Sequence, residues 1–376
     1  MTETRQVPFF NYPANFTSRK DEYLEVISDV LGRGAFILQE DLARFERNLE
    51  DFLEVKHVLG VADGTNALIL ALRALDIGPG DEVILASHTY IATAASVHFV
   101  GATPVLLECG RDHMIDPDSV EQAITDRTRV LMPTQLNGRT ANMDRIMTLA
   151  EKYDLHVVED AAQALGSKFR GKCAGTFGIA GTFSFYPAKV LGCFGDGGAV
   201  VTNDDDMARK LSLLRDHGRN EDGEVVAWGL NSRLDNLQAA ILDFKLKTYD
   251  RDIDRRREIA ALYQDQLGDL AELDLPPAPD AGGDHFDIYQ NYEIEADRRD
   301  ELREFLMRNN IGCPIQWGGK AVHQFENLGF DDVSLPATDR LFTRCFMLPM
   351  HPFLSDEDVM YVCRKIREFY GKNERS

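Results

Sequence analysis

The stretch VVEDAAQ, residues 157–163, indicates the end of a buried strand followed by a turn into a helix. Its two valines are β-branched, which favours a strand, and the carboxylate of Asp160 follows where the chain turns. Ligands in parallel α/β sheets gather at the carboxyl ends of the strands, so Asp160 is a candidate functional residue. A lone aspartate at this place more often only caps a helix, and the assignment therefore needs partners from elsewhere in the chain.

Helical and strand patterns alternate through the first two-thirds of the chain. Apolar residues three to four positions apart predict helices at 39–53 and 65–75, and helices are also expected at 118–124 and 142–152. Short apolar runs predict strands at 82–86, 104–107, 129–132, 156–159, 181–185 and 199–202. This alternation predicts the α/β class, with a mostly parallel sheet covered by helices on both faces.

The pattern changes near Asp250. A loop rich in Pro, Gly and Asp covers 275–284, a segment with period-two alternation follows at 287–294, and a helix is expected near 297–309. A chain of 376 residues is also longer than one core usually serves. We therefore expect a large domain over residues 1–250 and a smaller α+β domain over 251–376, with the N-terminal segment packed near the smaller one.

Composition excludes several kinds of partner. The formal net charge of −21 argues against nucleic acid, because a protein that binds a duplex needs a basic face. No apolar run reaches the ~18–20 residues that cross a bilayer, and residues 1–11 do not form a secretory signal. We therefore expect a cytoplasmic protein without a membrane partner. The six cysteines contain no C-x-x-C pair, so neither a metal site nor a disulfide framework is expected.

A lysine follows the next strand along the chain. In SFYPAK, residues 184–189, a strand ends shortly before Lys189, and the glycine-rich turn GDGG at 195–198 leads into another strand. Most loop lysines are simply solvated, but a lysine in a compact pocket can lose its proton and form a Schiff base with a carbonyl. A carboxylate such as that of Asp160 suits a cofactor with a ring nitrogen, because its charge keeps that nitrogen protonated.

A phosphate site is indicated by DGTNAL, residues 63–68, which opens a helix. Its Gly-Thr turn offers free N–H groups and the hydroxyl of Thr65, although ordinary capping is about as common. Ser184 offers a second hydroxyl five residues before the lysine. Tyr90, after the strand at 82–86, is placed either to stack on an aromatic ring or to pack in the core.

The order and spacing of these motifs resemble the sugar aminotransferases of the DegT/DnrJ/EryC1/StrS family, a branch of the fold-type-I pyridoxal-phosphate (PLP) enzymes. The resemblance runs from GAFIL at 34–38 to LPMHP at 348–352 and is densest over 64–242. It implies a PLP aminotransferase that moves an amino group from an amino acid, L-glutamate in this family, to the keto group of a nucleotide-linked sugar.

The resemblance implies roles for three residues around the cofactor ring. Lys189 forms the Schiff base with PLP and then shuttles the proton between substrate and cofactor. Asp160 pairs with the pyridinium nitrogen, and Gln163 lies over or beside the ring, near its hydroxyl.

The resemblance also implies a phosphate site shared between two subunits. Thr65, the backbone of Asn66, and Ser184 hold the phosphate, while Tyr90 stacks on the ring. Asn231, in GLNSRLD at 229–235, matches an asparagine that reaches the phosphate of the neighbouring subunit. A homodimer with shared active sites is therefore expected.

Residues around the lysine bear on which sugar carbon is aminated. The segment 186–198 looks more like the branch that acts on C3 of a nucleotide-linked 3-keto-sugar. The branch that acts on C4 more often carries a histidine before the lysine segment and Glu-Gly-Gly after it. QLNGR at 135–139 departs from a more common Leu-Tyr-Gly pattern, and His88 stands where the family usually has an aromatic residue. Candidate substrate contacts are Phe36, His88, Trp317 and His323, with packing an equal alternative for the last two.

Two other functions remain open from the sequence. One is a C4-aminotransferase of a keto-deoxy-sugar, and the other is a PLP-binding regulatory protein without turnover. The second is disfavoured because every catalytic position is present and no basic DNA-binding segment is found. A Walker-type phosphate loop is not supported, since 195–198 lacks the G-x-x-x-x-G-K-[ST] pattern.

Overall fold

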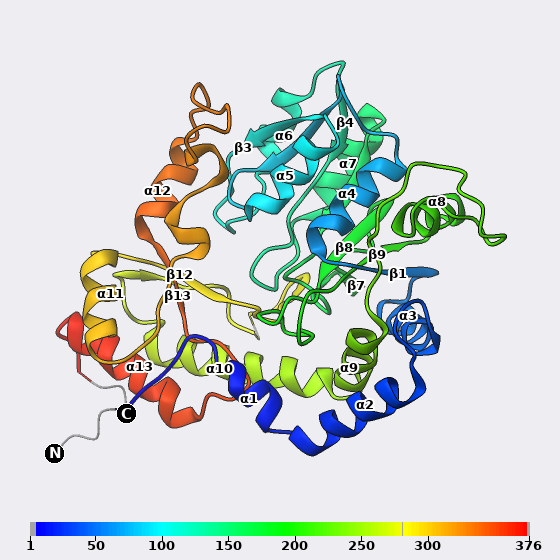
Figure 1. Ribbon diagram of the computed structural model, residues 1–376. Helices are drawn as coiled ribbons and strands as arrows, with labels where there is room; N and C mark the ends of the chain where they lie inside the picture. The colour runs from blue at the N-terminus through cyan, green and yellow to red at the C-terminus, as the bar shows by residue number, and fades with distance from the viewer. Residues whose placement is uncertain (1–4, 280, 374–376) are drawn as a thin grey trace.

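The computed structural model describes residues 5–279 and 281–373, and a seven-stranded sheet forms its centre (Figure 1). The strand order is β1-β9-β8-β5-β4-β2-β3, with the first two pairings antiparallel and the others parallel. The strands are β1 His57–Val61, β2 Glu82–Ala86, β3 Thr103–Leu107, β4 Thr128–Leu131, β5 His156–Asp160, β8 Ala180–Ser184 and β9 Gly198–Thr202. The predicted α/β class with a mostly parallel sheet is confirmed.

Helices cover both faces of this sheet because its strands are apolar on both sides. Neighbouring residues of one strand enter different cores: Val158 packs with one group of helices, and Val157 packs on the opposite face. One face carries α4 Gly64–Ala74, α5 Ile91–Phe99 and α8 Asp205–Arg215. The other carries α3 Glu40–Leu53, α6 Pro117–Ala123, α7 Met143–Tyr153 and α9 Asn236–Leu246.

A second, three-stranded sheet lies beside the first and has its own core. Its strands are β10 Leu273–Asp274, β12 Tyr292–Ala296 and β13 Cys345–Leu348. It packs with α10 Tyr249–Leu267, α11 Arg299–Arg308 and α13 Asp356–Phe369, while α12 Pro336–Arg344 contacts β12 and bonds to Glu108 and Cys109 after β3. The long helix α10 begins next to the predicted boundary at residue 250, and the division into two domains there stays a prediction.

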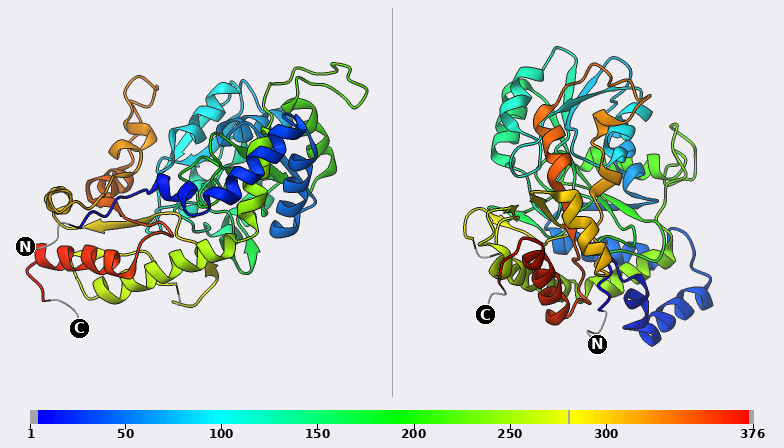
Figure 2. Two further views of the ribbon diagram at one scale, coloured as in Figure 1. Left: turned by 60° about the horizontal axis from the view of Figure 1, so that its bottom comes forward. Right: turned by 90° about the vertical axis from the view of Figure 1, so that its left-hand side faces the viewer.

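Short elements connect these parts. The hairpin β6 Lys168–Phe169 and β7 Lys172–Cys173 pairs with β11 His285–Phe286, and two 3-10 helices cover Gln316–Gly319 and Val322–Gln324. Figure 2 shows α1 Tyr12–Thr17 and α2 Lys20–Arg33 along the outside of the molecule. Ahead of them, Val7 pairs with Ile311 beside the second sheet. Among the described residues, no helix is long and apolar enough to cross a membrane.

The period-two segment at 287–294 differs from expectation. Only its last three residues belong to a strand, β12, and the preceding residues form a loop in which Tyr289 has a φ of 50°. The side chain of Gln290 instead bonds to the loop after β8, to Ala188 and Val190 on either side of Lys189. The local pattern could not reveal this long-range contact.

Candidate active site

Asp160, Ser184 and Lys189 lie at one end of the large sheet, where β5 and β8 finish and β9 begins. Asp160 is the last residue of β5 and is in register with Thr182 of β8. Ser184 ends β8, pairs with Gly198 of β9, and is followed after a short turn by Lys189. The prediction that these residues lie at the carboxyl ends of strands is thus confirmed, while their roles stay predictions.

Asp160 is a buried carboxylate, only 5% exposed. The hydroxyl of Thr93 donates to its Oδ2 at 2.7 Å, and the backbone N–H of Ala162 donates to its Oδ1 at 3.2 Å. Burial raises the pKa of Asp160, and the two hydrogen bonds and the charge of Lys189 oppose that rise. Residues 161–166 form turns, so the helix expected after Asp160 is absent and capping does not explain this carboxylate.

Lys189 is a half-buried lysine whose ammonium group has a lowered pKa. Burial lowers the pKa of Lys189 to about 8, although the nearby charge of Asp160 acts to raise it. Its backbone N–H closes a turn on Tyr186 O at 2.8 Å. Gln290 fixes the same loop, because its side chain accepts from Val190 N at 2.9 Å and donates to Ala188 O at 2.8 Å. A substantial share of the amine is therefore neutral near physiological pH, as a nucleophile requires.

The N-terminus of α4 lies directly against Ser184. A Cβ added to Gly64 would come within 2.8 Å of Ser184 Cβ, so only glycine permits this approach. Asp63 caps the helix, accepting from Asn66 N at 2.8 Å and from Asn66 Nδ2 at 2.6 Å. The N–H groups of Gly64 and Thr65 have no partner among the described residues and stay available to an anion, together with the Thr65 hydroxyl. The backbone of Asn66, in contrast, is already engaged by Asp63.

The remaining cofactor candidates lie on three separate loops. Gln163 accepts a hydrogen bond from Asn137 N at 2.8 Å. Tyr90 precedes α5 and is 55% exposed, so it is not a core residue. Asn231 is exposed and pairs with Asp216 at the base of a loop, 217–230, that extends from the body of the molecule (Figures 1 and 2).

The four substrate candidates do not form one surface. His88 is fully buried, and its ring packs 4.9 Å from that of Trp317. Both ring nitrogens of His323 are engaged, by Ser87 Oγ at 2.7 Å and Asp339 Oδ1 at 3.0 Å. Phe36 is 56% exposed and lies at the start of α9. Substrate contact by these residues stays a prediction.

A buried polar network behind His88 was missed in the sequence. Burial raises the pKa of Glu293, but its ion pairs with His88 and His113 outweigh this and hold it well below its usual range. Burial lowers the pKa of His113, but Glu293 and Glu295 outweigh this and raise it to about 10. Glu293 also accepts from Asn137 Nδ2 at 2.9 Å. No local motif marks these residues, because they come from both sheets.

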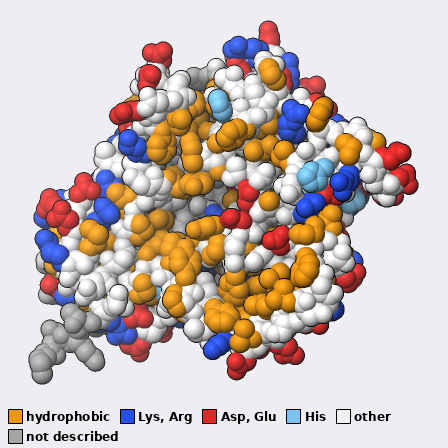
Figure 3. Space-filling model, in the orientation of Figure 1, with side chains coloured by type: hydrophobic (Ala, Val, Ile, Leu, Met, Phe, Trp, Pro, Cys, Tyr) orange, Lys and Arg blue, Asp and Glu red, His pale blue; other side chains and the backbone are white. Residues whose placement is uncertain are grey.

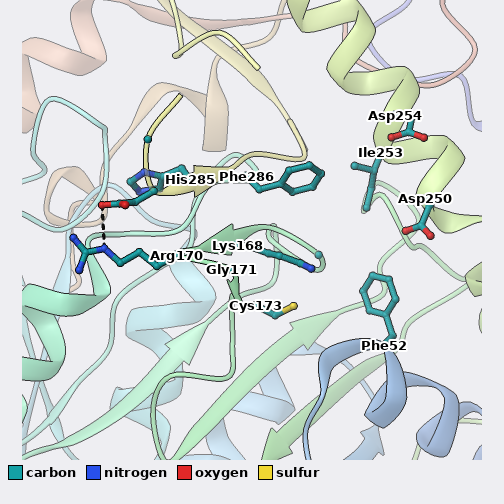
Figure 4. A pocket seen from close by; sticks show the side chains of 13 residues that line it. Phe52, Lys168, Arg170, Gly171, Cys173, Asp250, Ile253, Asp254, His285 and Phe286 are labelled. Atoms are coloured by element: carbon teal, nitrogen blue, oxygen red, sulfur yellow. Dashed lines mark ion pairs between the residues drawn. The ribbon is translucent and has the colours of Figure 1, made fainter. Parts of the chain in front are cut away.

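Two cavities flank these elements. One, of about 470 Å³, has Lys189 in its wall. The other, of about 710 Å³, lies between the β6–β7 hairpin and α10 and contains none of the predicted site residues (Figure 4). Figure 4 shows Lys168 between Phe52 and Phe286, with Asp250 and Asp254 on the facing helix.

Comparison with known proteins identifies this arrangement. A family model described as the DegT/DnrJ/EryC1/StrS aminotransferase family matches residues 17–367. The chain belongs to this family. Like the other DegT/DnrJ/EryC1/StrS aminotransferases, it is a PLP-dependent sugar aminotransferase.

Individual relatives are similar over their whole length. The dTDP-3-amino-3,4,6-trideoxy-alpha-D-glucose transaminase of Streptomyces venezuelae is 40% identical over 98% of this chain and 97% of that protein. A pleiotropic regulatory protein of Geobacillus stearothermophilus is 38% identical over 97% of this chain and 98% of that protein. The X-ray structure of S. venezuelae DesV in complex with a ketimine intermediate has a TM-score of 0.93 at 39% identity, covering 98% of this chain and 100% of that one.

The donor set of this chain fits PLP. The cofactor needs a negative charge near its ring nitrogen, an amine that can be neutral, and an anion site for its phosphate. Asp160 is a buried carboxylate, Lys189 has a lowered pKa, and the start of α4 offers unpaired N–H groups beside Ser184. Asp160, Lys189 and the start of α4 all lie at the same end of the large sheet.

Proposed function

We propose that this aminotransferase moves an amino group from L-glutamate to C3 of a nucleotide-linked 3-keto-sugar. The observation that carries the reaction class is that the buried carboxylate of Asp160 lies close enough to Lys189 for their charges to interact, while burial lowers the pKa of that lysine to about 8. Position C3 is supported by the segment 186–198 and by the name of the S. venezuelae relative, a 3-amino-sugar transaminase.

The residues of this chain position the cofactor and transfer protons. PLP, when bound, supplies the electron sink for the carbanion that forms at the reacting carbon. The carboxylate of Asp160, held by Thr93 and Ala162, would supply the negative charge that the ring nitrogen needs. Lys189 Nζ would hold the cofactor, and its lowered pKa suits it to accept and return a proton during the exchange. Thr65, Ser184 and the start of α4 orient the phosphate.

We propose further that two copies of the chain complete each active site. The loop 217–230 carries Trp228, which is 93% exposed, and the half-exposed Val225 and Val226. Apolar side chains also gather near the centre of the face in Figure 3, with most charged side chains around it. Large exposed apolar groups of this kind are typical of association surfaces. Asn231, at the base of that loop, is then placed to reach the phosphate of the neighbouring subunit.

Subunit complementation tests this shared site. Asn231→Ala is expected to weaken PLP binding by on the order of 10-fold, because one hydrogen bond to the phosphate is lost. Co-expression of Asn231→Ala with Lys189→Ala chains should restore activity at limiting PLP, since one site of each hybrid dimer keeps both residues. Random pairing makes about half of the dimers hybrids, so about a quarter of the parent activity is expected. Recovery no greater than the sum of the two separate variants would place each site within one subunit.

A substrate panel tests the reaction itself. Mixing the PLP enzyme with L-glutamate should remove the visible absorption of the bound cofactor, and 3-keto nucleotide sugars should restore it faster than their 4-keto counterparts. The panel is presented in dTDP- and UDP-linked forms, and the position of the new amine is read by NMR. Preference for 4-keto sugars would assign the enzyme to the C4-acting branch instead.

A non-catalytic regulatory role is the second candidate, favoured by the name of the G. stearothermophilus relative. Such a protein would bind PLP through the same residues but would not react with an amino donor. Retention of the visible absorption in the presence of L-glutamate and other amino acids would support it. The cytoplasmic location expected from the sequence stays a prediction.

A further inference from the structure

The side-chain amide of Gln163 is oriented by two asparagines. Its Oε1 accepts from Asn137 N at 2.8 Å, and Asn291 Nδ2 lies 3.4 Å from the same oxygen. A backbone N–H only donates, so the oxygen end of the amide must face Asn137. The other end, Nε2, has no partner among the described residues and stays available as a donor. The hydrogen bonds of Gln163 therefore fix which end of its amide is free.

Asn137 connects this amide to the second sheet. It follows β4 with a φ of 56°, a left-handed conformation in which asparagine is enriched. Its Nδ2 donates to Glu293 Oε2 at 2.9 Å, and its Oδ1 accepts from Gln316 Nε2 at 2.7 Å. One end of this side chain faces a carboxylate and the other an amide N–H, so it cannot turn over without losing both contacts. The backbone N–H that bonds to Gln163 thus belongs to a residue whose own side chain is fixed.

Glu293 is the buried carboxylate that holds Asn137. It lies on β12, is 2% exposed, and its Oε2 is 3.0 Å from His113 Nδ1. The other ring nitrogen of His113 faces Glu295 Oε1 at 3.3 Å, so the protonated ring donates to both glutamates. Burial opposes this charge, but the two carboxylates outweigh it and raise the pKa of His113 to about 10. Glu293 therefore faces a positive charge at physiological pH and stays ionised.

His88 approaches the same carboxylate from the loop after β2. It is fully buried, its Nδ1 donates to His113 O at 2.9 Å, and its Nε2 lies 3.7 Å from Glu293 Oε1. His88 and Asn137 both occupy positions at which this chain departs from the common family pattern. Because Glu293 contacts both, the two departures are parts of one local structure.

We propose that Asn137 and Glu293 are positioning residues, which turn the amide of Gln163 so that its N–H groups face the ring hydroxyl of bound PLP. Glu293 fixes the Asn137 side chain, and Asn137 fixes the amide. His88 and His113 hold the carboxylate, so His88 acts through Glu293 and not on the substrate. A residue of the second sheet thereby controls a contact of the cofactor. The proposal needs PLP to bind with its ring beside Gln163, as expected for this family, and it does not depend on which sugar carbon is aminated.

Asn137→Gly removes the side-chain contacts to Glu293 and Gln316 and keeps the backbone N–H that bonds to Gln163. Glycine adopts the left-handed conformation without strain, so the fold should persist. The amide then loses its fixed orientation, and the Kd of the apo-protein for PLP is expected to rise roughly 3- to 10-fold, as for one lost hydrogen bond. Titration of the apo-protein with PLP, followed by absorbance, measures this Kd. Asn327→Gly is the matched control and should not change it, because Asn327 is exposed and has a φ of 68°.

The pH dependence of the cofactor spectrum reports on the ring hydroxyl directly. A donor near that hydroxyl favours its deprotonated form, so loss of the donor should raise the pH at which the visible absorption changes. The rise expected in Asn137→Gly is roughly 0.5–1 unit, which corresponds to the same hydrogen bond. An effect on the stability of the fold alone would leave this pH unchanged.

A double-mutant cycle separates positioning from general effects on the fold. Gln163→Leu removes the amide and should show both changes in full. Adding Asn137→Gly to Gln163→Leu should change neither value further, because the amide through which Asn137 acts is already gone. Additive changes would show that Asn137 acts by another route and would overturn the proposal. Unaltered PLP binding in Gln163→Leu would refute it as well, since the amide would then not lie at the ring.

An exchange of the two side chains tests the role of Glu293. Asn137→Asp alone places two carboxylates against each other, so its Kd for PLP should rise at least as much as that of Asn137→Gly. Combining it with Glu293→Gln restores an amide–carboxylate hydrogen bond with donor and acceptor reversed, and the Kd should return to within about 3-fold of the parent. A double variant no better than Asn137→Asp would contradict the role of Glu293. These measurements use PLP without a sugar, so failure of the keto-sugar panel would count against the proposed function and not against this proposal.

Discussion

Lys189→Ala is expected to abolish turnover and the visible absorption of the bound cofactor while leaving the fold intact. The variant loses both the covalent link to PLP and the group that moves the proton. Proton transfer by a positioned base alone contributes roughly 10²–10⁴-fold, so the loss should be at least of that size. Absorbance spectra of the protein with added PLP and single-turnover kinetics with L-glutamate measure the two effects.

A second lysine provides a matched control for this experiment. Burial also lowers the pKa of Lys245 to about 8, but its Nζ donates to Gly192 O at 2.5 Å and does not lie at the strand ends. Lys245→Met should therefore keep the visible absorption. In the parent, attachment of PLP to the apo-protein should speed up as the pH rises through about 8, because only the unprotonated amine of Lys189 attacks. Retention of the absorption in Lys189→Ala, or its loss in Lys245→Met alone, would refute the assignment.

Asp160→Asn is expected to bind PLP but to lose on the order of 10²–10³-fold in rate. The amide has nearly the same shape: its oxygen can still accept from Ala162 N, and its NH2 can donate to the Thr93 hydroxyl once that hydroxyl turns, but the charge that keeps the ring nitrogen protonated is gone. The loss should appear in the rate of the glutamate half-reaction, measured by stopped-flow absorbance. A variant as fast as the parent would show that this carboxylate does not serve the ring.

The same variant has an effect that can be measured without turnover. The charge of Asp160 raises the pKa of Lys189, so removing it should move that pKa below about 8. The pH dependence of PLP attachment should then shift towards lower pH. Thr93→Val keeps the charge and removes only one hydrogen bond, so its effect on the rate should be smaller. An unshifted profile in Asp160→Asn would mean that the two side chains do not interact.

The parts of the fold that depend on local pattern were predicted well from the sequence. The apolar runs at 82–86 and 199–202 differ from β2 and β9 by at most one residue, because short buried strands between turns leave a clear mark. The placement of Asp160 and Ser184 at strand ends followed from the same pattern. The helix expected after Asp160 was wrong, since residues 161–166 form turns.

Residues that act through contacts between distant segments could not be predicted. Thr93 is an ordinary threonine in an apolar helix, and only the fold shows that it donates to Asp160. Asp63 looked like part of a phosphate motif, yet its side chain engages Asn66 and changes which N–H groups remain. Glu293 reaches His113 and Asn137 across 156 or more positions of the chain. Such pairings leave no spacing signal.

The Gln290 side chain hydrogen-bonds to Ala188 O and Val190 N, and these contacts constrain how chimaeras of family members can be built. A chimaera that takes residues before 250 from one parent and the rest from another separates this amide from the segment it braces. Only parents that both carry an amide-bearing residue there would keep the reactive amine in place. A chimaera designed to change the sugar preference should therefore take residue 290 and the loop 187–190 from the same parent.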